Sequence, residues 1–120
     1  MYRFSFEKLE VWNQSRNLII RLYGITCKFP ESEKYGLVAQ IRRSEVSIAS
    51  NIAEGSTRTT GKSQANFTQI AFSSLMELLN QLIIAQNLGI FPKEEMDKIR
   101  SSIEEIANKL NSLRKYQLNN

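Results

Sequence analysis

The segment Gln40–Gly55, which reads QIRRSEVSIASNIAEG, decides how this chain folds. Apolar residues in and just before it recur at helical spacing and form one line suited to a core: Leu37, Ile41, Ile48 and Ile52. A second line beside it holds mostly short side chains that form hydrogen bonds: Gln40, Ser44, Ser47, Asn51 and Glu54. The opposite side carries Val46, Ala49 and Ala53 beside Arg42. We therefore predict a helix with neighbours on more than one side.

The length and composition predict one domain over residues 1–120. The chain is 42% hydrophobic, which is enough for a packed core, and it contains only five glycines and two prolines. No continuous apolar run approaches the roughly 20 residues that span a bilayer. Residues 1–7 lack the apolar core of a signal peptide. We expect a cytoplasmic protein with no membrane partner.

Helix signals divide the chain into four segments. The first is expected over residues 6–27 and ends before Pro30, because the residue before a proline avoids helical geometry. The second is expected over residues 31–54, with Gly55 as its stop. The third extends over residues 63–88, with Ser63 as its N-cap, and the fourth begins near Pro92 and ends near Tyr116. These segments predict an all-α fold.

The third predicted helix has almost no charge. Between Ser63 and Ile90 the only charged side chain is Glu77. A helix of about 25 residues on the outside of a monomeric bundle normally shows a charged face. This one shows uncharged polar groups and apolar side chains in most directions, Phe72 and Met76 among them. We infer that another subunit covers part of it. The alternative is an exposed face that is polar but uncharged.

The residue inventory argues against most kinds of catalysis. Cys27 is the only cysteine and the chain has no histidine, so Ser-His and Cys-His nucleophiles and the commonest metal ligand are absent. Glu54 and Glu77 are the expected interior acids, and they are too few for a carboxylate metal site in a bundle. We predict no catalytic residue, no cofactor and no metal.

The tripeptide Gly61-Lys62-Ser63 resembles the end of a phosphate-binding loop. That motif needs a glycine five residues before the final Gly-Lys-Ser, and Ser56 occupies the position. The motif also follows a strand, whereas this tripeptide follows a predicted helix. A nucleotide site is therefore not expected.

The adjacent arginines Arg42 and Arg43 receive different interpretations. Arg43 lies near the polar line, so we predict an internal pair with Glu54 or Glu77, because an unpaired buried charge is costly. The predicted structural polar network is Gln40, Arg43, Ser44, Ser47, Asn51, Glu54 and Glu77. The net charge is +4, and its whole excess lies in residues 1–62. Four side chains from that half are the candidate contacts for nucleic acid: Lys34, Arg42, Arg58 and Lys62.

These residues resemble a known family, the four-helix-bundle intervening-sequence proteins found in insertions within bacterial large-subunit ribosomal RNA genes. The resemblance rests on Phe6-x-x-Leu9-x-Val11-Trp12, Tyr35-Gly36-Leu37, Gln40-x-Arg42-Arg43-Ser44, Asn51-Ile52-Ala53-Glu54-Gly55 and Ile70-Ala71-x-Ser73-Ser74-Leu75-x-Glu77-Leu78. It covers almost the whole chain. One departure is Ser73, where the family often has glycine.

The resemblance implies an antiparallel up-down-up-down four-helix bundle and a ring-like homo-oligomer, a pentamer. A related branch, the accessory proteins of diversity-generating retroelements, forms basic pentamers that engage nucleic acid. Two hypotheses follow for this chain. It is a non-enzymatic oligomer that binds RNA or DNA through a basic surface, or it is a protein–protein scaffold or adaptor. An enzyme is the weakest alternative, because helical RNases commonly use histidine.

Overall fold

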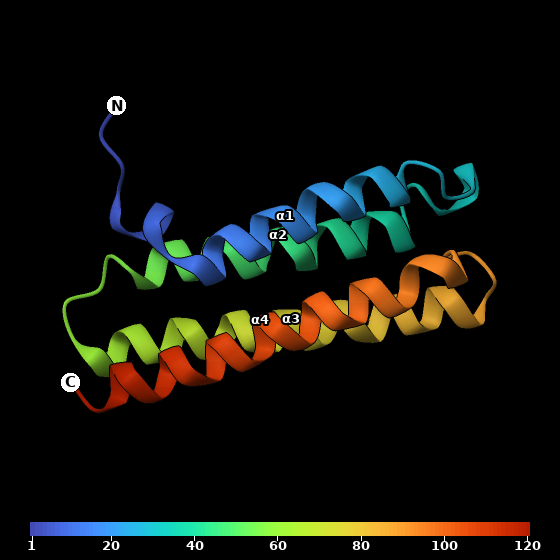
Figure 1. Cartoon of the computed structure of the whole chain (residues 1–120). Helices are drawn as coiled ribbons and strands as arrows, with labels where there is room; N and C mark the ends of the chain where they lie inside the picture. The colour runs from blue at the N-terminus through green and yellow to red at the C-terminus, as the bar shows by residue number, and fades with distance from the viewer.

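Four α-helices make up almost all of the computed structural model, which describes residues 1–120 (Figure 1). They are α1 (Glu10–Thr26), α2 (Leu37–Gly55), α3 (Gly61–Asn87) and α4 (Lys93–Leu118). Two short 3-10 helices precede the first two, namely η1 (Ser5–Lys8) and η2 (Glu31–Glu33). The prediction of an all-α fold is confirmed.

The starts of the helices differ from the predicted ones. Leu9 is extended, so residues 5–8 form the separate turn η1 and α1 begins only at Glu10. The second helix was predicted from residue 31, but residues 31–33 form η2 and α2 begins after Gly36. Ser63 is not the N-cap of α3. Thr60 is the cap, and its Oγ1 accepts a hydrogen bond from the Ser63 backbone N–H at 3.1 Å.

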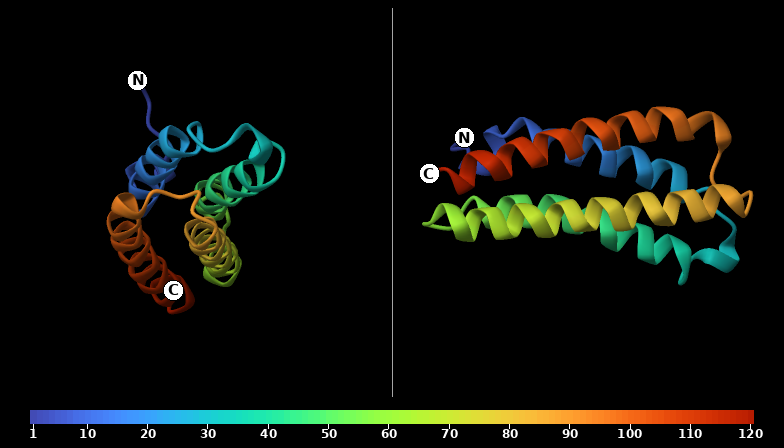
Figure 2. Two further views of the ribbon diagram at one scale, coloured as in Figure 1. Left: turned by 90° about the vertical axis from the view of Figure 1, so that its right-hand side faces the viewer. Right: turned by 90° about the horizontal axis from the view of Figure 1, so that it is seen from below.

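Consecutive helices are joined by short connections and pack side by side, and α4 also packs on α1 (Figure 2). The arrangement is an up-down-up-down four-helix bundle. The connection between α3 and α4 depends on Gly89, whose φ of +74° favours glycine. This turn lets the backbone N–H groups of Ile90 and Phe91 both donate to the Ala85 carbonyl.

The core contains apolar side chains from all four helices. Side chains with less than 2% of their surface exposed include Leu22, Ile41, Ile48, Leu75, Leu78, Leu82, Ile99, Ile106 and Leu110. Fully burying one such side chain contributes about 1.5 to 3 kcal/mol, so this cluster dominates the stability of the fold. Of the predicted apolar line on α2, Ile41, Ile48 and Ile52 are buried and Leu37 is half-buried.

At the end of the bundle where both chain termini lie, α3 and α4 approach each other closely. A Cβ at Gly61 would overlap the Gln117 carbonyl oxygen, so only glycine fits there without a shift. Two turns along, the Thr68 hydroxyl donates to Gln117 Oε1 at 2.7 Å, and both side chains are buried. These contacts fix how α4 lies along α3.

The outer surface of α3 is as poor in charge as its sequence predicted. Ser73, Met76, Glu77, Asn80 and Ile84 are exposed on it, and only Glu77 is charged. By length and composition α3 is the one helix that could also cross a membrane. The core helix of a bundle meets the same criterion, and α3 supplies much of this core through Leu75, Leu78 and Leu82.

Candidate functional site

A polar groove runs between α2 and α3, where the polar line of α2 meets the α2-facing flank of α3. The Ser44 hydroxyl donates to Glu77 Oε1 at 2.9 Å and also contacts the Gln40 carbonyl at 3.0 Å. The Ser47 and Ser74 hydroxyls lie 2.9 Å apart and share a hydrogen bond. These bonds hold the middle of α2 level with the middle of α3.

We call this depression the α2–α3 groove. It has a volume of about 560 Å³, and every side chain that lines it is polar: Gln40, Arg43, Ser44, Ser47, Glu77 and Gln81. Five of the seven residues in the predicted network therefore lie around one depression. Asn51 joins at its edge, where its Nδ2 donates to Ser47 Oγ at 3.1 Å. Glu54 is exposed and its carboxylate makes no hydrogen bond, so it lies outside the network.

The predicted internal pair of Arg43 with a glutamate is wrong. Arg43 is exposed and forms no ion pair, and both glutamates considered for it, Glu54 and Glu77, are exposed as well. The physical reason is that Ser44, not Arg43, points at Glu77 and supplies the donor for its carboxylate. Arg43 lies at the outer rim of the α2–α3 groove, with its charge open to water.

The buried acid of the molecule is Glu45, which the sequence analysis missed. Its side chain is fully buried, and neither carboxylate oxygen has a hydrogen-bond partner. Burial raises the pKa of the Glu45 carboxyl from 4.5 to about 8, and the positive charge of Arg42 opposes part of that rise. Glu45 follows Ile41 by four residues and precedes Ile48 by three, so its place on the core line was readable from the spacing.

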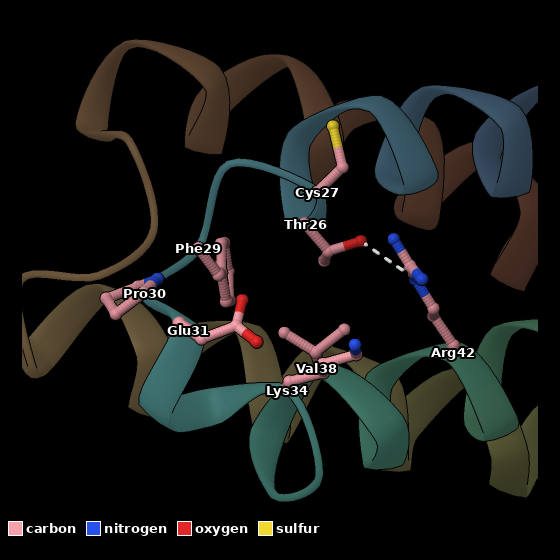
Figure 3. A pocket seen from close by; sticks show the side chains of 8 residues that line it. All are labelled: Thr26, Cys27, Phe29, Pro30, Glu31, Lys34, Val38 and Arg42. Carbon is pink, nitrogen blue, oxygen red and sulfur yellow. Dashed lines mark hydrogen bonds between the residues drawn. The ribbon is translucent and has the colours of Figure 1, made fainter.

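Arg42 is half-buried between α1 and α2 instead of lying on the surface. Its Nε donates to Thr26 Oγ1 at 3.2 Å, and its guanidinium carbon lies 4.2 Å from the centre of the Tyr23 ring. Figure 3 shows Arg42 at one side of a pocket of about 180 Å³ at the α1–α2 connection, which Lys34 and Cys27 also line. Both contacts of Arg42 help hold α1 against α2.

The four predicted nucleic-acid contacts do not form one patch on a single chain. Lys34 and Arg42 lie toward the end with the α1–α2 connection, whereas Arg58 and Lys62 lie at the end with the α2–α3 connection (Figure 1). Arg42 is on α2, and the 13 residues of the helix from Arg42 to Gly55 still separate the two pairs by about 20 Å at 1.5 Å per residue. Arg58 lies 4.5 Å from the centre of the Phe67 ring, and Lys62 is exposed in the first turn of α3.

The opposite ends of the bundle differ in charge. The end with the termini, called here the basic end, carries six basic side chains: Arg3, Lys8, Arg58, Lys62, Arg114 and Lys115. Only three acidic side chains accompany them: Glu7, Glu10 and Glu54. The other end is nearly balanced, with the basic Arg21, Lys28, Lys34, Arg42, Lys93 and Lys98 against the acidic Glu31, Glu33, Glu94, Glu95 and Asp97.

No group of three or more cysteine, aspartate or glutamate side chains is placed to hold a metal ion. The tripeptide Gly61-Lys62-Ser63 forms the first turn of α3, where Thr60 caps the helix. The geometry is that of a four-helix bundle with a polar groove, one buried carboxyl and a basic end.

Comparison with known proteins agrees with the helical-bundle fold. Residues 7–112 match the family described as 23S rRNA-intervening sequence protein, and this chain belongs to that family. The solved structures include a similar one, a protein with unknown function from the S23 ribosomal protein family of Bacteroides thetaiotaomicron. It is 25% identical, with a TM-score of 0.77, and the match covers 88% of this chain and 98% of that one. No curated protein matches the chain.

Proposed function

We propose that this chain is a non-enzymatic protein that assembles with copies of itself and binds RNA or DNA phosphates at its basic end. One observation carries the proposal: that end has six basic side chains and only three acidic ones. Phosphate contacts from lysine and arginine supply most of the sequence-independent affinity for nucleic acid. Membership of a family named for intervening sequences of 23S rRNA supports RNA as the first ligand to test.

Self-assembly would strengthen such binding. When copies related by rotation about an axis parallel to the bundle come together, their basic ends lie on one face of the assembly. The charges of several subunits then add to one field, which raises both the affinity for a polyanion and its dependence on salt. The family resemblance implies a pentamer, and we adopt an assembly of this kind as part of the proposal.

A binding titration tests the proposal. A fluorescently labelled RNA hairpin and a DNA hairpin of the same sequence are titrated with protein from low to physiological salt, and anisotropy is recorded. We expect binding that weakens steeply with salt. The double variant Lys62→Ala/Lys115→Ala should weaken binding and reduce the salt slope by about 1 per lost phosphate contact.

The matched control for this experiment is Lys93→Ala/Lys98→Ala, which removes two lysines from the balanced end. It should bind as the unmodified chain does. An absence of binding to either hairpin at low salt would contradict the proposal. Equal losses in the two double variants would show that the basic end is not the site.

The second candidate function is a protein–protein scaffold or adaptor. The outer surface of α3 favours it, because Glu77 is the one charge on it and the exposed Met76 and Ile84 suit contact with a protein. A pull-down from cell extract distinguishes the two functions. Recovery of RNA without any stoichiometric protein partner would count against the scaffold.

A further inference from the structure

The pocket at the α1–α2 connection, called here the α1–α2 pocket, lies at the end of the bundle away from the basic end. Its volume is about 180 Å³. Pockets for drug-sized ligands start at about 300 Å³, so this one has room only for a smaller molecule. Phe29, Pro30 and Val38 supply its apolar lining, and the Phe29 ring packs edge-on against Phe91 with 6.3 Å between ring centres. The α3–α4 connection therefore holds this lining in place.

Three charged side chains line the same pocket: Glu31, Lys34 and Arg42. None of them forms an ion pair within the chain, although two are cations and one is an acid. The Lys34 backbone N–H donates to the Glu31 carbonyl at 3.1 Å, so both side chains leave the same turn. Figure 3 shows Glu31 and Arg42 on opposite sides of the pocket, with Lys34 below them. A ligand with charges of both signs would pair with all three.

The guanidinium of Arg42 is held in position by contacts within the chain. The buried Thr26 hydroxyl donates to the Leu22 carbonyl at 2.8 Å and accepts from Arg42 Nε at 3.2 Å, while the Tyr23 ring packs on the guanidinium. The two terminal nitrogens of Arg42 have no hydrogen bond within the chain. Glu45 does not neutralise this charge at pH 7, because burial raises the pKa of its carboxyl to about 8. Arg42 is thus a fixed cation with free donors.

We propose that the α1–α2 pocket binds a free α-amino acid with a small apolar side chain, such as valine. The carboxylate of the ligand lies between Arg42 and Lys34, where the guanidinium donates charge-assisted hydrogen bonds to it. The ammonium pairs with the Glu31 carboxylate, and the apolar side chain packs on Phe29 and Val38. This site is at the other end of the molecule from the proposed nucleic-acid surface, and it does not depend on that function.

The charges of the pocket discriminate against simpler ligands. Inorganic phosphate satisfies the two cations but is repelled by Glu31, and a simple amine is repelled by Arg42 and Lys34. A carboxylate without an ammonium leaves Glu31 without a partner. The ends of a peptide chain each carry only one of the two charges. An α-amino acid carries both on one carbon, so it alone matches the full set.

Isothermal titration calorimetry on the full chain at constant ionic strength tests the proposal with four probes. L-Valine is compared with isovalerate, which lacks the ammonium, with isobutylamine, which lacks the carboxylate, and with inorganic phosphate. We expect saturable binding of valine. Each of the other probes should bind about tenfold more weakly or not at all, because each loses a charge-assisted hydrogen bond or meets a like charge.

Two variants assign the charges of the ligand to side chains. Glu31→Gln should weaken valine binding about tenfold without weakening isovalerate, whereas Lys34→Ala should weaken both. Both side chains are exposed and have no partner within the chain, so both variants should fold. The matched control is Lys28→Ala, which removes the same charge from the same connection but lies outside the pocket. It should bind valine as the unmodified chain does.

The other outcomes each contradict the proposal. No saturable binding of valine at millimolar concentration would overturn it. Isovalerate or phosphate that binds as well as valine would show an anion site that does not recognise the ammonium. An equal loss in Lys28→Ala would show a general effect of charge. Valine-induced changes in amide chemical shifts that miss Thr26, Phe29 and Lys34 would place the ligand elsewhere. The hairpin titration tests the basic end separately, so either proposal can fail alone.

Discussion

Polar residues on the two sides of α2 lie in opposite environments, one buried and one open to water. On the core side, on the line of Ile41 and Ile48, Glu45 is buried and its carboxylate has no hydrogen-bond partner. On the side facing α3, Ser44 bonds to Glu77 in a groove open to water. The residues Arg43, Ser44 and Glu45 are consecutive, yet they occupy a rim, a groove and the core. The angle of a residue around the helix, and not its polarity, decides which environment it meets.

The largest expected effect comes from Glu45→Gln. The folded state keeps the Glu45 proton up to a pKa of about 8, whereas the unfolded state loses it near 4.5. The folded pKa is the higher one, so this contribution to stability is complete below pH 4.5 and is lost as the pH rises toward 8. At about 1.4 kcal/mol per pH unit the loss is of the order of 5 kcal/mol. The glutamine variant should lack this loss and be the more stable form at pH 8.

Urea unfolding at pH 5, 7 and 9 measures this difference, because the two chains share every other titrating group. Glu54→Gln is the matched control, since Glu54 is also on α2 but is exposed, and it should follow the unmodified chain. Parallel pH curves for the unmodified chain and Glu45→Gln would mean that the buried carboxyl does not hold its proton. The contrast between the two sides of α2 would then fail.

A smaller effect should separate the two arginines. Arg42→Ala removes the bond to Thr26 and the contact with the Tyr23 ring, and we expect it to cost about 1 to 2 kcal/mol. Arg43→Ala removes no contact within the chain and should change stability by less than about 0.5 kcal/mol. Thermal or urea unfolding at the lowest practical protein concentration keeps the contribution of assembly small. Equal losses, or a larger loss for Arg43→Ala, would restore the internal role first predicted for that residue.

The smallest effect is expected in the α2–α3 groove. Ser44→Ala removes the donor to Glu77, but Glu77 is exposed and water can replace the lost hydrogen bond. We expect a loss of about 0.5 kcal/mol, measured by urea unfolding beside Ser50→Ala, an exposed serine on the same helix. A loss above about 2 kcal/mol would show that the groove is as tightly coupled to folding as the core.

Much of the fold could be predicted from sequence because helix periodicity and breakers act locally. The first helix ends before Pro30 as expected, and Ile41, Ile48 and Ile52 are buried as their spacing indicated. The second helix ends one residue later than predicted, because Gly55 is its last helical residue and Ser56 is the cap. The helix starts were harder to place. The turn at residues 31–33 and the cap at Thr60 depend on backbone geometry that several residue types satisfy, so the sequence favoured neighbouring positions.

The site was predictable only in part. Hydrogen-bonding residues at steps of three and four had to share a flank, which is why Gln40, Ser44 and Ser47 line one groove. The partner of Glu77 could not be read in the same way, because it depends on how α2 and α3 are rotated against each other. Glu45 was passed over because a charged residue is expected at the surface, although its spacing placed it on the core line.

The close approach of Gly61 to Gln117 has a consequence for how uniquely this sequence specifies its bundle. Rows of leucine and isoleucine repeat along α3 and α4, so sliding one helix by a turn, about 5.4 Å, would still bring apolar side chains together. Such a slip would separate Gly61 from the backbone it touches, and the buried Gln117 Oε1 would lose the hydroxyl that Thr68 donates to it. One glycine and one buried hydroxyl thus exclude alternative alignments of α3 and α4 that the apolar residues alone would tolerate.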